Sequence, residues 1–167
     1  YANMTMAAIT LYEHTGDTTF LDQAIAWVDQ TNEGYWDNVN GGYFLTAASA
    51  TDVITRSKTV TDNATPSGNG TMMNVLARLF ALTGNTDYRD RADAMNKLFS
   101  SPEIDRLVGQ TVMLCGFELL TQATQIVVVG NPDDPDTTAL LQTVHKTSVP
   151  TQVLLRLSPD ASLPPDH

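Results

Sequence analysis

A short motif occurs twice in this chain, 68 residues apart, and this internal repeat limits the possible folds more than any other feature of the sequence. Residues 11–24 (LYEHTGDTTFLDQA) and residues 79–92 (LFALTGNTDYRDRA) share both spacing and chemistry. The identical pairs are Leu11/Leu79, Thr15/Thr83, Gly16/Gly84, Thr18/Thr86, Asp22/Asp90 and Ala24/Ala92. A repeat of this kind indicates that one supersecondary unit is built twice.

Each copy of the motif predicts a helix, a tight turn and a second helix. Gly16 and Gly84 suit the left-handed conformation that commonly follows the last turn of a helix. Asp17 or Thr18, and their counterparts in the second copy, can cap the helix that comes next. The repeat therefore predicts two α-helical hairpins.

The two helices of each hairpin differ in their apolar patterns. Residues 2–14 and 71–82 are apolar on most faces, which is typical of helices buried on several sides. The second helices are apolar on one side only. Because an (α/α) toroid has an inner and an outer ring of helices, we predict a mainly α fold in which residues 1–122 form the hairpins of a partial toroid. A plain solenoid stays possible, although the period exceeds the usual helical repeats of about 34 to 47 residues.

Extra length lies between the two hairpins, in residues 33–69. The turn signal Asn40-Gly41-Gly42, followed by the short strand candidate Tyr43–Thr46, predicts a β-hairpin insertion. The rest of this excursion is polar. A long ordered excursion in a compact domain is more often functional than accidental, so a ligand site is expected here.

The pattern changes after Pro102. We expect a helix over residues 109–121 with Met113, Leu114, Phe117 and Leu120 facing inward. The β-branched run at 125–130 predicts a buried strand, 137–146 a helix capped by Asp134 or Asp136, and 151–157 a second strand. Such a β-α-β segment, residues 123–158, pairs its strands in parallel. Residues 159–167 are expected to form a flexible tail.

The charge and composition exclude several classes of protein. With 19 acidic and 9 basic residues, the net charge is −10, which argues against nucleic acid and membrane partners. No apolar run approaches the roughly 20 residues of a membrane-spanning helix. The first residues lack the features of a signal peptide. We expect a cytoplasmic protein in which Tyr1 is an internal position of a longer chain.

No cofactor or metal site is expected from the sequence. Cys115 is the single cysteine, and its apolar neighbours predict a buried, inert thiol. The three histidines show no ligand spacing. The single glycine after the 125–130 strand is not a dinucleotide-binding fingerprint.

Several motifs carry a family resemblance. They are the W-D…G-G-Y-F element at Trp36, Asp37, Gly41, Gly42, Tyr43 and Phe44, the R-x-K at Arg56 and Lys58, the D-x-A-x-P-S-G-N string at Asp62, Ala64, Pro66, Ser67, Gly68 and Asn69, the L-T-G-x-x-x-Y at Leu82–Tyr88, and the stretch 126–141. On these residues the chain resembles the C-terminal half of the thioredoxin-domain-containing, DUF255-type proteins, the spermatogenesis-associated protein 20 family. Asn63 and Thr65 depart modestly from the family pattern.

This resemblance implies a thioredoxin-like domain outside the chain and a six-hairpin toroid similar to those of sugar epimerases and glycosidases. The implied function is carbohydrate binding or processing in the full-length parent, although fold alone does not fix chemistry. The alternative is a non-catalytic helical scaffold or interaction module for the thioredoxin-like domain. In either case we expect the fragment itself to be inactive and to self-associate through exposed inner helices.

The excursion supplies the candidate site residues. Asp62 is the candidate catalytic carboxylate, and a sugar or small-molecule ligand would be bound by Trp36, Tyr43, Lys58, Asn63, Ser67 and Asn69. Sugar hydroxyls need such a mixture of donors and acceptors, and aromatic rings can pack on a sugar face. Each residue also has a structural interpretation: Ser67 or Asn69 as a helix cap, Asp62 as a loop brace, the aromatic rings as core, and Lys58 as solvated or paired with an acid.

Overall fold

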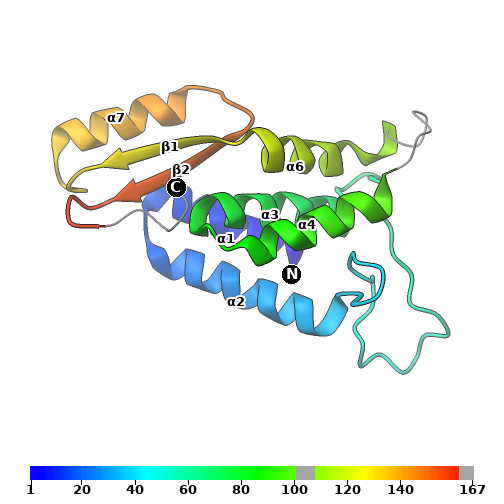
Figure 1. Ribbon diagram of the computed structural model, residues 1–167. Coiled ribbons are helices and arrows are strands. Elements are labelled where there is room, and N and C mark those ends of the chain that lie inside the picture. Colours follow the sequence, from blue (N-terminus) through cyan, green and yellow to red (C-terminus); the bar gives the residue numbers. More distant parts are fainter. Residues whose placement is uncertain (101–107, 162–167) are drawn as a thin grey trace.

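The computed structural model describes residues 1–100 and 108–161, and over these ranges the chain is mainly helical with a small parallel sheet (Figure 1). The elements are α1 (Ala2–Thr15), α2 (Thr18–Tyr35), α3 (Gly68–Thr83), α4 (Thr86–Phe99), the 3₁₀ turn η1 (Val108–Gln110), α6 (Thr111–Gln122), β1 (Thr124–Val129), α7 (Pro135–Lys146) and β2 (Gln152–Leu157). The predicted fold class is confirmed.

Local chemistry ends and restarts the helices where the repeat predicts. Gly16 and Gly84 both follow a helix with positive φ, 75° and 70°, and the amide of each donates to the carbonyl four residues earlier. Asp17 accepts the Thr19 amide to cap α2, and Asn85 caps α4 in the same way. The two hairpins of the repeat are therefore confirmed.

Helices α1, α3 and α6 lie side by side in one row and run in the same direction. Near the C-terminal end of α1, Glu13 pairs with Arg78 of α3 at 3.0 Å. Gly70, at the start of α3, lies against Val112 at the start of α6. Gln125, just after α6, donates to the carbonyl of Ala81 near the end of α3. The starts of the three helices lie together and so do their ends, so they share one layer. Of the three, α3 is buried on most sides, whereas α1, predicted to be buried on several sides, exposes Met4 and Leu11.

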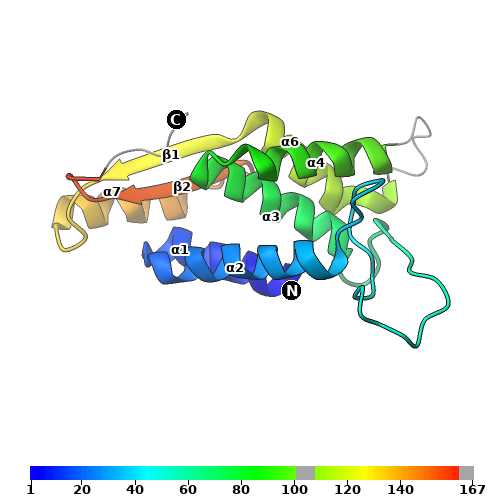
Figure 2. The same ribbon diagram turned by 60° about the horizontal axis from the view of Figure 1, so that its bottom comes forward.

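Helices α2 and α4 cover this row from outside, as Figure 2 shows for α2 beside α1 and α4 beside α3. Helix α3 contributes more to the core than any other described element, because nearly every apolar side chain along it is buried. At Gly116 the row is so tight that an added Cβ would lie 2.8 Å from the backbone nitrogen of Asn74. A glycine is therefore required where α6 crosses α3.

The C-terminal β-α-β segment is present, with β1 and β2 paired in parallel from Thr124↔Gln152 to Val129↔Leu157. Val153 and Leu155 of β2 face the helical row, whereas Leu154 packs with Leu141 of α7. The prediction that β1 is buried was wrong: most of its side chains are exposed, because β2 takes the place between the helices and α7. The predicted domain boundary at residues 122 and 123 stays a prediction.

The excursion contains less sheet than the sequence predicts. Its turn closes with one antiparallel bridge, Trp36↔Tyr43, and Tyr43–Thr46 form no strand. The reason is that the backbone amides find separate partners: the Tyr43 amide donates to the Asn69 side chain, and the Leu45 amide to the Ser57 carbonyl. The β-hairpin is thus reduced to a bridged turn.

Two predictions about α6 were wrong. Leu114 is 43% exposed rather than inward, and Cys115 is an exposed free thiol. The buried positions of α6 are Met113, Gly116 and Leu119, because α3 contacts that side of the helix. Most of the predicted tail, residues 162–167, lies outside the described residues.

None of the helices in residues 1–100 and 108–161 is long and apolar enough to cross a membrane. Within the same ranges, no group of three histidine, cysteine or acidic side chains is placed to hold a metal ion.

Candidate functional site

The candidate site lies where the part of the excursion between α2 and α3, residues 36–67, folds against the N-terminal end of α3 (Figure 1). Asn69, in the first turn of α3, is the centre of this contact and is only 2% exposed. Its Oδ1 accepts the Tyr43 amide at 2.8 Å, while its Nδ2 donates to the carbonyls of Tyr43 at 2.9 Å and Thr59 at 2.8 Å. One side chain thus ties two distant parts of the excursion to the helix.

Asp62, the candidate catalytic residue, has both carboxylate oxygens occupied. Oδ1 accepts the Ser67 amide and Oδ2 accepts the Val112 amide, each at 2.9 Å. Partial burial raises the pKa of this carboxyl. The hydrogen bonds from Ser67 and Val112 lower the pKa by more than burial raises it, so the pKa lies below its usual value. A carboxylate held ionised in this way is suited to accepting amides and is a poor proton donor at neutral pH.

Ser67 is the N-cap of α3. Its Oγ accepts the Gly70 amide at 3.0 Å and donates to the Val60 carbonyl at 3.0 Å. The side chain is 6% exposed, so both ends of the hydroxyl are used inside the protein. The serine fixes the last part of the excursion at the point where the helix starts.

Lys58 and Asp37 form an ion pair across the excursion, with Nζ and Oδ2 separated by 2.7 Å. Nζ also donates to the Gly41 carbonyl at 2.7 Å. The hydrogen bond from Lys58 is the main reason that the pKa of the Asp37 carboxyl lies well below its usual range, and the Val39 amide adds to the effect. Lys58 therefore holds the bridged turn in place.

The two aromatic residues of the predicted platform pack on each other. The rings of Trp36 and Tyr43 meet edge to face with centroids 4.9 Å apart. The Tyr43 hydroxyl donates to Asn32 at 2.7 Å, and burial raises the pKa of this phenol. The guanidinium of Arg91 covers the Trp36 ring at 4.9 Å. Asn63 is exposed at the outer end of the excursion.

The structure joins Tyr43 to Asn69 and Ser67 to Asp62, and it joins Lys58 to Asp37 rather than to Asp62. The polar groups of these residues point at each other and at backbone amides. The sequence analysis missed Asn32 as the partner of Tyr43 and the amide of Val112 as the partner of Asp62. No local signal reveals them, because both partners come from other elements of the fold. Ligand binding by these residues stays a prediction.

An aromatic hollow lies beside this network, with a cavity volume of about 280 Å³. It is bounded by the ends of α1, α2 and α3 and by the excursion. Its lining residues are Tyr1, Ala2, Thr31, Tyr35, Tyr43, Phe44, Leu45, Gly68 and Met72. The walls are largely apolar, so the hollow can accept a ligand face more readily than a charged group.

Comparison with curated proteins gives a consistent result. The chain is 34% identical to spermatogenesis-associated protein 20 of Rattus norvegicus, 33% identical to that of Mus musculus and 30% identical to that of Homo sapiens. Each alignment covers 164 residues, which is 97% of this chain and 21% of the relative. The chain therefore spans about a fifth of the length of these relatives. No family model matches the sequence.

Proposed function

Because the chain belongs to the spermatogenesis-associated protein 20-like family, we propose that it is a wall segment of an (α/α) toroid in a longer protein. Its function there is that of a helical scaffold on which other parts of that protein pack. The parallel row of α1, α3 and α6 carries this proposal. The family resemblance adds a thioredoxin-like domain as one of the parts held by the scaffold. A cytoplasmic location for the whole protein is proposed from the sequence expectation.

The free side of α1 is where the next helix of the row would pack. Met4, Ala7 and Leu11 recur at intervals of three and four residues, so they share one side of the helix. Met4 is 56% and Leu11 44% exposed. Glu13, which contacts α3, lies on the opposite side. An apolar stripe directly opposite the existing partner is the feature that an interior member of a row needs.

Light scattering of the isolated chain at high concentration tests this proposal. An uncovered stripe favours self-association, so the unmodified chain is expected to form dimers or larger species. Leu11→Glu places a charge in the stripe and is expected to yield a monomer. Leu140→Glu is the matched control, because Leu140 is 58% exposed on α7, and this variant should associate like the unmodified chain. A clean monomer for the unmodified chain would contradict the proposal.

A second function, carbohydrate binding or processing in the parent protein, is favoured by the aromatic hollow beside the excursion. In this proposal Asn69 holds the backbone of Tyr43 in the wall, and the rings of Tyr35 and Phe44 contact the sugar. Asp62 as a catalytic acid fits the geometry less well, since amides occupy both of its oxygens.

The sugar proposal is tested on the longer protein with glucose and N-acetylglucosamine as probes, using calorimetry. Tyr35→Ala is expected to weaken binding at least about ten-fold, because aromatic contact area is lost. Thr51→Ala, at an exposed position of the same excursion outside the hollow, should leave the affinity unchanged. Failure of both probes to bind saturably would contradict this function while leaving the scaffold proposal intact.

A further inference from the structure

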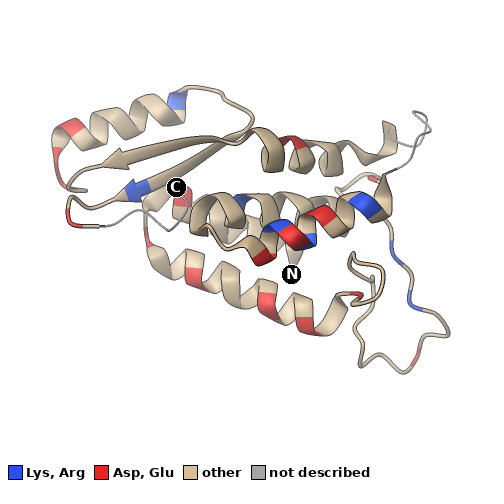
Figure 3. Cartoon of the chain, in the orientation of Figure 1, with Lys and Arg blue, Asp and Glu red and all other residues tan. Residues whose placement is uncertain are grey.

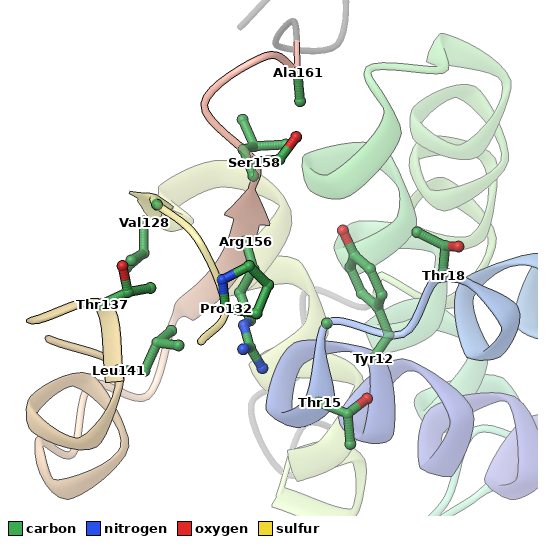
Figure 4. Close-up of a pocket in the computed structure, with 13 residues that line it drawn as sticks. Tyr12, Thr15, Thr18, Val128, Pro132, Thr137, Leu141, Arg156, Ser158 and Ala161 are labelled. Carbon is green, nitrogen blue, oxygen red and sulfur yellow. The ribbon is translucent and has the colours of Figure 1, made fainter. Parts of the chain in front are cut away.

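A hollow of about 350 Å³ opens where the two parallel strands end, on the side of the β-α-β segment that faces the α1–α2 turn (Figure 4). Its residues come from four places: the α1–α2 turn, the end of β1, the first turns of α7, and the end of β2. In open α/β units, ligands bind at the carboxyl ends of parallel strands, because the loops there diverge. The volume is in the range of small-molecule sites.

Arg156 of β2 brings a positive charge to this hollow. Its Nη1 donates to the His14 carbonyl at 2.9 Å, which fixes the guanidinium at the end of α1. Gly16 makes room for it, since a Cβ at this glycine would lie 3.1 Å from Nε. Within residues 1–100 and 108–161, no carboxylate pairs with Arg156.

The placement of Arg156 is unusual in a chain of net charge −10. Arg156 is the single charged residue of β2 (QVLLRL), and Figure 3 shows acidic residues on the turns at this end of the sheet. Two acids of the flanking turns serve as helix caps, Asp17 for α2 and Asp134 for α7. Among the described residues, no ion pair joins Arg156 to the other nearby acids, Asp133, Asp136 and Asp160. The guanidinium therefore keeps N–H donors available to a ligand.

Two residues that are nearly buried as a whole present hydroxyl groups to the same hollow. Tyr12 is 7% and Thr137 9% exposed, and neither hydroxyl has a hydrogen-bond partner among the described residues. In Figure 4 the Tyr12 ring rises from α1 between Arg156 and Thr18. Both hydroxyl groups open onto the hollow, because neither is among the buried unpartnered atoms of the described residues, so each is free to hydrogen-bond with a ligand there.

The remaining wall is apolar. Val128 of β1 and Leu141 of α7 close one side of the hollow, and Pro132 lies over it (Figure 4). A single cation, two hydroxyls and apolar walls together suit a small molecule with one charged oxygen-rich end and an apolar body.

We propose that this hollow binds a small organic oxyanion. The charged end pairs with the guanidinium of Arg156 and accepts a hydrogen bond from the Tyr12 hydroxyl, and the apolar body lies against Val128 and Leu141. The charged end is a carboxylate or a phosphate, which share this recognition chemistry. The site is separate from the excursion and from the free side of α1.

The test titrates the 167-residue chain with benzoate and with phenyl phosphate, with benzyl alcohol as the neutral probe, and follows backbone amide shifts by NMR. Saturable shifts are expected at Gly16, Gly130 and Ser158 with at least one anion, and the anion that binds more tightly identifies the charged group. Weak or absent shifts with benzyl alcohol are expected, because the alcohol lacks the charge.

Three variants make the test specific. Arg156→Gln keeps a donor for His14 but removes the charge, and it should weaken anion binding at least about ten-fold. Tyr12→Phe removes one hydroxyl and should weaken binding several-fold. Arg89→Gln is the control, because Arg89 is an exposed arginine of α4 outside the hollow, and its affinity should equal that of the unmodified chain.

Any of three results would overturn the proposal. The first is that neither anion produces saturable shifts at the hollow. The second is that benzyl alcohol binds as tightly as the anions. The third is that both Arg156→Gln and Tyr12→Phe bind the anions like the unmodified chain. Circular dichroism confirms that each variant is folded, and Tyr12→Phe keeps the inference testable if Arg156→Gln unfolds.

Discussion

Replacing Asn69 by alanine tests how the excursion is held to the helical row. The change removes three hydrogen bonds and leaves the Tyr43 amide and two carbonyls without their partner in a buried place. Each net hydrogen bond contributes about 1 kcal/mol, so the expected loss is about 3 kcal/mol of unfolding free energy. For a domain of this size, that corresponds to a fall in the melting temperature of roughly 6 to 12 °C.

Urea unfolding followed by circular dichroism measures this loss, and hydrogen exchange at the Tyr43 amide shows whether the excursion opens. Asn63→Ala is the matched control, since Asn63 is an exposed asparagine of the same excursion and its replacement should change the stability by less than about 0.5 kcal/mol. A loss below about 1 kcal/mol for Asn69→Ala, with an unchanged Tyr43 exchange rate, would refute this reasoning.

Two further predictions concern packing and pH. Gly116→Ala should lower the unfolding free energy by about 1 to 3 kcal/mol, because the new methyl group meets α3. Gly34→Ala has open space around it and should stabilise α2 by up to about 1 kcal/mol. Thermal unfolding of both variants checks this. The pKa of His145 is lowered by burial and by the nearby charges of His14 and Arg156. The folded state therefore binds fewer protons than the unfolded state, and the stability should fall as the pH drops below about 6.5. His145→Gln should flatten this decline in urea midpoints measured from pH 7.5 to 5.5.

The helices were predictable because their signals are local. A left-handed glycine and a capping side chain lie within a few residues of the turn that they form, as at Gly16 and Asp17. The β-α-β segment was predictable for a similar reason, since Asp134 begins α7 at the turn signal. These features depend on short stretches of chain and not on the rest of the fold.

The errors came from contacts between distant parts of the chain. The sequence predicts a strand at Tyr43–Thr46. In the structure the Tyr43 amide instead donates to the side chain of Asn69, which lies 26 residues further along the chain. The periodicity of α6 predicts an apolar side without saying which helix contacts it, so Leu114 and Cys115 were placed on the wrong side. The apolar run of β1 could not reveal that the neighbouring strand β2 would be the better covered one.

The candidate site shows the same division. Sequence spacing identified the residues that gather at the start of α3, including Ser67 and Asn69. It did not show that Asp62 accepts an amide from α6, because that amide lies 50 residues away. Residue type identifies groups able to bind a ligand, whereas only the fold shows whether those groups are already bound to each other.

The central claim is that α1 is an interior member of a longer row of helices. Thiol labelling at Leu11→Cys, with Cys115 replaced by serine, measures this directly, since Leu11 lies in the free stripe of α1. The account predicts that Leu11→Cys is labelled rapidly in the isolated chain under dilute, monomeric conditions and is strongly protected in the longer protein. The control Leu140→Cys, on α7, should be labelled rapidly in the isolated chain. Equal, rapid labelling of Leu11→Cys in both proteins would contradict the claim.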